Sequence, residues 1–185
     1  MLAWCYATPP HLPSVRASLH TAVDFLFTHH MLLRSEGRRE IDLADLWCLP
    51  LDNEGPTPCM AFVLLRDHGK TNTASRVEYS AAMRHRNPLV CLLFNLSAYL
   101  MYMWEVERVP PPNFQRRRTW YYYKLFPGGS NDGLVSYDTL RVRTRQLLDA
   151  GGLTAVQKST HLARAEGAKF VDMPNVTLAG FPYTL

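Results

Sequence analysis

The first long amphipathic segment of the chain lies between residues 14 and 34. Its apolar side chains recur every three or four positions, at Val15, Leu19, Val23, Leu26 and Phe27. This spacing places them on one face of a helix. The serine before the first apolar position is a residue type that caps helix N-termini. The pattern therefore predicts a capped helix that packs one face against a core.

The most apolar stretch runs from residue 88 to residue 106 and reads PLVCLLFNLSAYLMYMWEV. Asn95, Ser97 and Glu105 interrupt it. Its unbroken apolar pieces are shorter than the roughly 20 residues that a bilayer-spanning helix needs. We therefore expect a buried core helix over about residues 88–107, and no membrane partner.

Short apolar runs between turn residues follow the first helix. Residues 47–51 and 60–66 have the apolar content of strands, and the segment DNEGPTP between them is rich in turn formers. Residues 76–80 would return from a second hairpin with its tip at 68–72. A short helix over 41–46 would precede the first strand. The pattern predicts a small antiparallel three-stranded sheet.

The second half of the chain after the core helix is mainly helical in pattern. A Pro-rich link, VPPPNF, leads to three consecutive arginines at 116–118 and to the aromatic run 120–123. A serine-capped helix is predicted over 136–150, and a further helix over about 160–172. The spacing of these elements shows no internal repeat.

These elements predict an α+β fold that is mostly α: a helical domain with one small antiparallel three-stranded sheet. A chain of 185 residues with 47% apolar residues is long enough for one domain with a real core. We expect an irregular N-terminal segment over 1–13 and the folded domain over 14–174. Residues 175–185 would form a truncated or degenerate tail.

The charge composition adds a mild indication of a nucleic-acid partner. The net charge is +4, and arginine outnumbers lysine by sixteen to four. Arginine presents a planar fork that matches phosphate, so a basic balance built from arginine favours nucleic acid over mere solubility.

The cysteines indicate neither disulfides nor a metal site. None of the four lies in a C-x-x-C motif, and no secretory signal precedes them, so they read as reduced thiols. A zinc site assembled from Cys48, Cys59, His68 and His85 would match no standard ligand spacing. We expect no metal and no cofactor.

Four side chains suit phosphoryl transfer at a DNA phosphodiester. Arg34 ends the first predicted helix, and Lys70 lies at the tip of the second hairpin. His161 and Arg164 are three residues apart and share one helix face. Arginines bind the non-bridging phosphate oxygens and stabilise the charge that develops there. A lysine or histidine can protonate the leaving oxygen. The order predicts one phosphate-facing site.

This order resembles that of the tyrosine recombinase catalytic domain, and longer stretches are similar to a narrower family. They are RSEGRR, LPLDNEGPTPCMAFVLLRDHGKTN, EYSAAMRHRNPLVC, WYYYKL and THLARAEGAK. They resemble a fungal family that contains the second domain of the DNA-binding subunit of the budding-yeast centromere (kinetochore) complex. Related copies occur in Crypton-type mobile elements. The resemblance extends over roughly residues 15–172.

The resemblance implies a tyrosine-recombinase-like fold, duplex DNA as the partner and a location in the nucleus. By the same resemblance, Arg34 corresponds to the first arginine of the recombinase site and Lys70 to its hairpin lysine. His161 and Arg164 correspond to the H-x-x-R motif. Whether the chain forms a homodimer stays open.

The sequence departs from the recombinase pattern after Arg164. Recombinases continue with a second His or Trp and then a nucleophilic tyrosine. Here a single tyrosine, Tyr183, follows in the context FPYTL, close to the motif and next to a proline. We therefore expect a truncated or degenerate, non-catalytic domain that keeps Arg34, Lys70, His161 and Arg164 as a residual site.

The residues expected to contact DNA extend beyond this site to basic side chains near it in the sequence. The set comprises Arg34, Arg38, Arg39, Lys70, Arg76, Arg84, His85, Arg86, Arg116, Arg117, Arg118, Lys124, Lys158, His161 and Arg164. We expect the arginines at 116–118 to contact phosphates and the neighbouring Trp120 and Tyr123 to pack in the core.

Two alternative functions remain open. An active recombinase of a mobile element would form a covalent link between a tyrosine and a DNA 3′-phosphate. An Arg-rich protein-interaction module would instead bind an acidic partner. Each cation also has a plainer interpretation on its own, as a solvated side chain or, for Arg34, as a favourable charge at a helix C-terminus.

Overall fold

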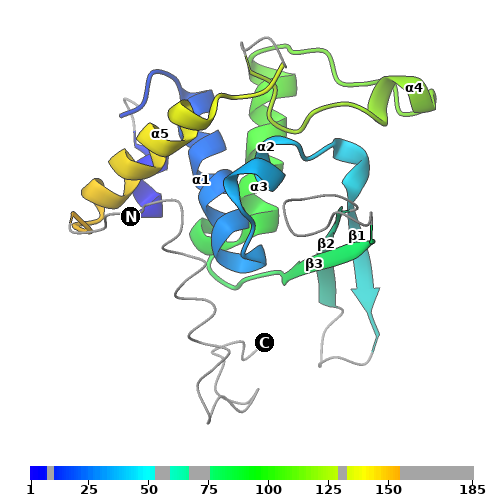
Figure 1. Ribbon diagram of the computed structural model, residues 1–185, viewed down its shortest axis with the longest axis horizontal. Coiled ribbons are helices and arrows are strands. Elements are labelled where there is room, and N and C mark those ends of the chain that lie inside the picture. Colours follow the sequence, from blue (N-terminus) through cyan, green and yellow to red (C-terminus); the bar gives the residue numbers. More distant parts are fainter. Residues whose placement is uncertain (8–10, 53–58, 67–75, 129–132, 155–185) are drawn as a thin grey trace.

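The computed structural model describes residues 1–7, 11–52, 59–66, 76–128 and 133–154. Figure 1 shows helices gathered around a central helix, with a small sheet to one side and one short helix projecting outward. The helices are α1 (Val15–Met31), α2 (Ser35–Arg39), α3 (Leu92–Met101), α4 (Arg117–Trp120) and α5 (Tyr137–Ala150), and the strands are β1 (Leu46–Leu51), β2 (Cys59–Arg66) and β3 (Glu78–Met83).

Helix α1 confirms the first predicted element and is more enclosed than its pattern indicated. The Ser14 side chain accepts a hydrogen bond from the Ala17 N–H at 3.1 Å and so caps the helix. Consecutive residues 17–24 are all buried, so no face of this part of the helix is left to solvent. The reason is that α3 and α5 both pack on α1 (Figure 1).

The core joins α1 to the sheet and to the segment after α4. Phe27 of α1 lies between Phe62 of β2 and Phe126, with ring centroids 6.2 Å apart in both pairs. All three rings are at most 5% exposed. Burial of such large apolar side chains is the main favourable term in folding.

The sheet is antiparallel with the order β1-β2-β3, as the sequence predicted. Leu46 pairs with Leu64 at one end of the β1–β2 ladder, and Arg66 pairs with Glu78 at one end of the β2–β3 ladder. The third strand occupies Glu78–Met83 rather than residues 76–80. The central strand β2 contributes most of the buried sheet residues because it has a neighbour on each side.

Two segments differ from the sequence-based prediction. Residues Leu2–Tyr6, expected to be irregular, form a 3₁₀ helix that buries Leu2 and Cys5 in the core. The predicted helix over 88–107 consists of a 3₁₀ turn (Pro88–Val90), α3 and a π turn (Tyr102–Val106). The Asn95 side chain donates hydrogen bonds to the carbonyls of Pro88 at 3.0 Å and Cys91 at 2.8 Å, which holds the irregular start against α3.

A row of polar residues lies inside the core along α1. His20, Asp24 and Thr28 are four residues apart, share one helix face and are each at most 4% exposed. Arg38 of α2 reaches into this row: its Nη1 lies 3.0 Å from Asp24 Oδ2 and also contacts the Thr28 hydroxyl. The ion pair fixes the position of α2 against α1.

Acid is expected to destabilise the fold through His20. This ring is 4% exposed and stacks on Phe126. Burial, reinforced by the nearby charges of Arg143, Arg16 and Arg38, lowers the pKa of His20 from 6.5 to about 3. Below pH 6.5 the unfolded chain therefore binds a proton that the folded chain excludes. Stability should fall as the pH drops from 6.5 toward 3, by at most about 1.4 kcal/mol per pH unit.

Urea unfolding at pH 7, 6 and 5 measures this dependence. His20→Phe should flatten it, because phenylalanine keeps the stacking and removes the titration. Burial also lowers the pKa values of His29 and His30 and raises the pKa of Asp24, which acts in the opposite direction, so a smaller slope should remain. A slope as steep in His20→Phe as in the wild type would show that another group is responsible.

Arg108 adopts a left-handed backbone conformation, with φ of 58°. Its side chain is 80% exposed and its ion pair with Glu105 spans 3.6 Å on the surface. A left-handed non-glycine residue costs roughly 1–2 kcal/mol, whereas an exposed ion pair contributes about 0–1 kcal/mol.

Arg108→Gly is therefore expected to raise the free energy of unfolding in urea by roughly 0.5–1 kcal/mol. Arg141→Gly inside α5 provides the opposite control, with an expected loss of about 1 kcal/mol. Destabilisation by both variants would contradict the assignment of strain to Arg108.

Candidate nucleic-acid interface

Arg34 lies in a sharp turn between α1 and α2. The turn begins at Leu32, which takes a left-handed conformation with φ of 54° and ends α1. Arg34 is the N-cap residue of α2 and is partly exposed. Among the described residues its guanidinium has no hydrogen-bond or ion-pair partner, so it is free to bind an anion.

The last residue of β2 lies close to α2. A side chain carbon added at Gly37 of α2 would lie 3.8 Å from Nη1 of Arg66, the last residue of β2. The side chain at the end of β2 therefore reaches α2. Lys70, Lys158, His161 and Arg164 themselves lie outside the described residues, so the grouping of the four predicted catalytic side chains stays a prediction.

Three basic residues of the set expected to contact DNA make contacts inside the fold, and of these only Arg38 is fully buried. Arg38 is 2% exposed and paired with Asp24, so it is a core residue and we remove it from the set. Arg39 donates from Nε to the Val135 carbonyl at 2.6 Å. Lys124 lies 2.9 Å from Asp42 and donates to the Glu40 carbonyl at 3.1 Å. The sequence shows their charge and not the side to which they point.

A first exposed basic cluster follows β3. Arg84 and Arg86 are both exposed. His85 between them is partly buried, and its Nδ1 accepts a hydrogen bond from the Asn87 N–H at 3.0 Å. That bond fixes the turn, so the two arginines leave it on a defined backbone. Arg76, before β3, is 79% exposed and lies 3.3 Å from Glu78.

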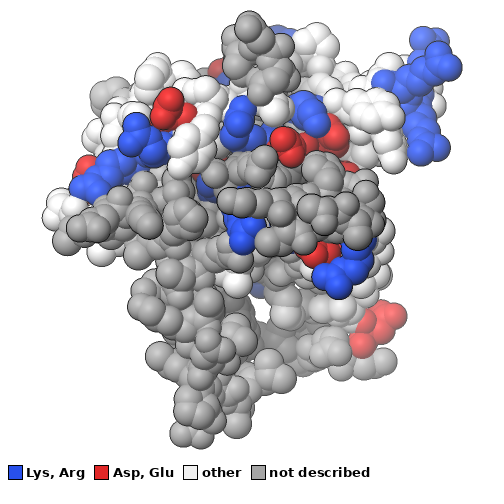
Figure 2. Space-filling model, in the orientation of Figure 1, with Lys and Arg blue, Asp and Glu red and all other residues white. Residues whose placement is uncertain are grey.

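A second exposed basic cluster, Arg116–Arg118, lies at α4. Figure 1 shows α4 projecting from the body of the molecule, and Figure 2 shows a group of basic side chains at the same place. The Thr119 hydroxyl donates to the Asn113 and Arg116 carbonyls, at 2.5 and 2.7 Å, and closes the turn. The Arg117 guanidinium lies 4.5 Å from the centroid of the Tyr121 ring.

The exposure of the aromatic residues after this cluster differs from the expectation. Trp120 and Tyr123 are partly buried, so neither belongs to the fully buried core. Tyr121 is 37% exposed and Tyr122 75% exposed. Sequence reasoning did not single these two out, although four consecutive aromatic residues in a short turn cannot all face one core. Their exposure places ring faces beside the arginines of α4.

Pairing with carboxylates separates the surface arginines into two groups. The paired group consists of Arg16–Glu107, Arg66–Glu78, Arg76–Glu78, Arg108–Glu105, Arg141–Asp138 and Arg145–Asp149, with N–O distances of 3.0–3.6 Å. In the described part of the chain, Arg84, Arg86 and Arg116–Arg118 have no such partner. A cation without a neighbouring carboxylate can bind an external phosphate without first breaking an ion pair.

The described residues contain no group of three or more His, Cys, Asp or Glu side chains placed to hold a metal ion. All four cysteines are free thiols. Over the same residues, no helix combines the length and the apolar character that crossing a bilayer requires.

Comparison with known proteins gives one family and one fold. The family model described as "Centromere DNA-binding protein complex CBF3 subunit, domain 2" matches residues 10–182. No curated protein sequence matches the chain. Among solved structures, the XerH site-specific recombinase, in a pre-cleavage complex with its difH substrate, is similar with a TM-score of 0.56 and 14% identity.

The similarity to this recombinase covers 92% of the chain but only 39% of the recombinase, so the chain spans about two fifths of its length. At 14% identity the similarity establishes the fold alone. It confirms the prediction of a mostly helical, tyrosine-recombinase-like fold with a small three-stranded antiparallel sheet.

Proposed function

The chain belongs to the family of the second domain of the CBF3 centromere DNA-binding subunit, and on that premise we propose that it binds the backbone of duplex DNA without cutting it. The observation that carries this proposal is a set of exposed arginines that have no carboxylate partner among the residues that the structure describes: Arg84, Arg86 and the α4 cluster Arg116–Arg118. Arg34 adds a third position, with a guanidinium that has no partner in the described part of the chain.

These side chains suit phosphates rather than base edges. Each guanidinium can make two parallel hydrogen bonds to the non-bridging oxygens of one phosphate. The two clusters are presented by a fixed turn after β3 and by the short helix α4, both too short to enter and read a groove as a recognition helix does. We therefore propose binding with strong salt dependence and weak sequence preference.

Exchange of Arg84 and Arg86 for glutamine tests the first cluster. Loss of two phosphate contacts should make the slope of log K against log salt less steep by about 1.8. The matched control is Arg141→Gln/Arg145→Gln, which removes the same charge from the surface of α5, where both arginines are paired with aspartates. Equal slopes in the two double variants would contradict a phosphate role for Arg84 and Arg86.

A competition experiment separates this proposal from a protein-interaction module. Binding to a labelled duplex should resist polyglutamate at a charge concentration at which unlabelled duplex displaces the label. Displacement by both competitors to the same extent would favour an acidic protein partner instead.

The absence of cleavage is a separate part of the proposal, and Tyr183, the tyrosine that follows Arg164 in the given sequence, is the side chain with which to test it. Incubation with a nicked duplex that traps covalent intermediates should yield no protein–DNA adduct. An adduct that disappears in Tyr183→Phe would instead establish strand transfer and overturn the non-catalytic proposal.

Two finer features of the proposal come from the family alone. A centromere-binding role implies a nuclear location, which a fluorescent fusion should show by overlap with chromosomal DNA. Homodimer formation is a separate prediction: light scattering should give twice the chain mass of 21.1 kDa if it occurs and the chain mass if it does not.

A further inference from the structure

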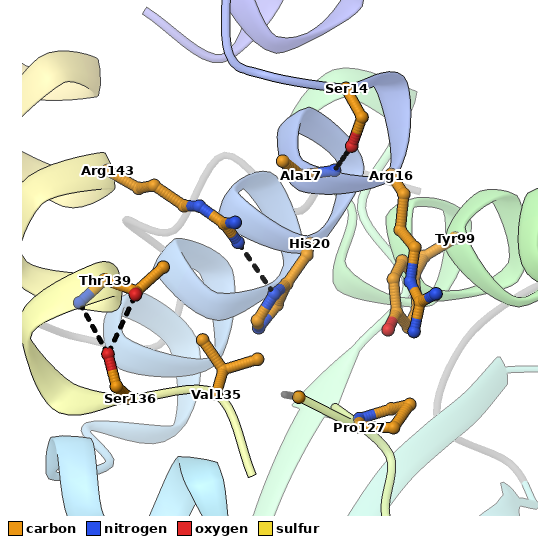
Figure 3. A pocket seen from close by; sticks show the side chains of 11 residues that line it. Ser14, Arg16, Ala17, His20, Tyr99, Pro127, Val135, Ser136, Thr139 and Arg143 are labelled. Carbon is orange, nitrogen blue, oxygen red and sulfur yellow. Dashed lines mark hydrogen bonds between the residues drawn. The ribbon is translucent and has the colours of Figure 1, made fainter. Parts of the chain in front are cut away.

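A cavity of about 580 Å³ opens between the N-terminal ends of α1 and α5. Tyr99 of α3 and the segment at Pro127 and Gly128 complete its wall (Figure 3). The polar lining residues are Ser14, Arg16, His20, Tyr99, Ser136, Thr139 and Arg143. A concave site of this volume, with apolar walls and a few converging polar groups, has the dimensions of small-molecule sites.

The cavity carries more positive than negative charge. Arg16 and Arg143 both line it, and Arg16 forms an ion pair with Glu107 at 3.2 Å. Arg143 has no carboxylate within ion-pair distance in the described part of the chain. Its closest polar contact runs to Nδ1 of His20 at 3.5 Å (Figure 3). Burial lowers the pKa of the Arg143 guanidinium, although an arginine keeps its charge in proteins.

His20 forms a neutral, inward-facing part of the cavity wall. Because a guanidinium only donates, Nδ1 of His20 accepts from Arg143 and the ring proton resides on Nε2. That Nε2 is buried and has no partner among the described residues. The ring therefore leaves the positive charge of Arg143 uncompensated.

Two helix N-termini add to the positive potential. Ser14 caps α1, of 17 residues, and Ser136 caps α5, of 14 residues, and both caps line the cavity. Each N-terminus acts as roughly +0.5 charge. The guanidinium groups of Arg16 and Arg143 and the carboxylate of Glu107 together carry a net charge of +1. With the two helix N-termini added, the site presents a charge of about +2 in total. A phosphate monoester carries about −1.5 to −2 at pH 7.

We propose that this cavity binds a phosphate group, held by Arg143, Arg16 and the N-termini of α1 and α5. The hydroxyl of Tyr99 lies beside it as a further potential donor, and the Thr139 hydroxyl, 2.8 Å from Ser136 Oγ, lines the same wall. The volume leaves room for the remainder of a small phosphorylated molecule, and the partly open mouth also admits a phosphate attached to a longer chain.

The site is separate from Arg34, one of the residues proposed to contact DNA. The cavity lies at the first turn of α1, and Arg34 follows the last. A helix of 17 residues rises by about 25 Å, so the two positions lie at opposite ends of the molecule's central helix. The inference therefore goes beyond duplex binding and does not depend on it.

Titration of the full chain with inorganic phosphate in a calorimeter tests the proposal, with chloride of equal ionic strength as the blank. We expect saturable binding and a rise of the thermal midpoint in phosphate over chloride. Arg143→Gln should lower the phosphate affinity by roughly tenfold or more, since it removes a charge-assisted contact.

Arg141→Gln is the matched control, because it removes the same charge from α5 at an exposed position paired with Asp138. It should bind phosphate like the wild type. Arg143→Lys is the second variant, for use if Arg143→Gln lowers the thermal midpoint below the temperature of the titration. It keeps the positive charge and loses the planar guanidinium. It should bind phosphate more weakly than the wild type.

Competition between phosphate and duplex DNA identifies the source of the phosphate. If phosphate and duplex compete for the wild type beyond the effect of equal ionic strength, and Arg143→Gln abolishes the competition, the cavity takes a DNA phosphate. If both bind together, it takes a small phosphorylated molecule. Equal phosphate affinity in the wild type, Arg143→Gln and Arg143→Lys, or no saturable binding at all, would overturn the proposal.

Discussion

Replacement of Arg116, Arg117 and Arg118 by glutamine is expected to weaken duplex binding by roughly 10²- to 10³-fold at 0.1 M salt. All three are exposed, and none has a carboxylate partner in the described residues. Figure 2 shows a group of basic side chains where α4 projects. Each phosphate contact contributes about a factor of 8 at 0.1 M salt relative to 1 M, through the counterions that it releases. Fluorescence anisotropy with a labelled duplex measures the change.

The salt dependence distinguishes lost contacts from a folding defect. Three lost contacts should make the slope of log K against log salt less steep by about 2.7, whereas misfolding reduces the active fraction at every salt concentration alike. Arg141→Gln/Arg145→Gln again serves as the charge control. A triple variant with wild-type affinity and slope would show that α4 does not lie on DNA.

Arg38→Met is expected to lower the free energy of unfolding by about 3–5 kcal/mol. Arg38 and Asp24 are each at most 2% exposed and their charged atoms are 3.0 Å apart. Removal of the cation leaves a buried carboxylate without its partner, and that desolvated charge accounts for most of the loss. The Thr28 hydroxyl loses its contact as well. Urea unfolding at pH 7 gives the difference directly.

A second substitution separates the ion pair from loss of packing. Arg38→Met/Asp24→Leu removes both charges and should recover most of the stability, because an apolar pair of similar volume can replace a buried ion pair at little cost. Arg141→Met, at a pair in which both side chains are more than half exposed, should change stability by less than about 1 kcal/mol. A double variant as unstable as Arg38→Met would show that lost packing, and not the unpaired charge, causes the loss of stability.

The elements of the fold were largely predictable because periodicity and caps are local properties. Ser14 and Ser136 both cap helices at the predicted positions, and the three strands pair as the turn residues indicated. The N-terminal 3₁₀ helix was not predictable, since its burial depends on contacts with α1 and α5 that are distant in sequence.

The candidate sites were predictable in chemical type and less so in membership. Arg38 and Arg118 look alike in the sequence, yet one is 2% exposed and the other lies on the surface. The difference arises from Asp24, which stands one helix away and faces inward. The cavity at Arg143 left no sequence signal, because its walls come from the starts of two helices separated by more than a hundred residues.

The most direct test of duplex binding is the affinity of the wild-type chain for a duplex oligonucleotide between 50 and 200 mM salt. If Arg34, Arg84, Arg86 and the α4 arginines all contact phosphates, the slope of log K against log salt should be about −5. A slope near zero, or no binding at 50 mM salt, would contradict the proposal that this chain binds the phosphate backbone of duplex DNA.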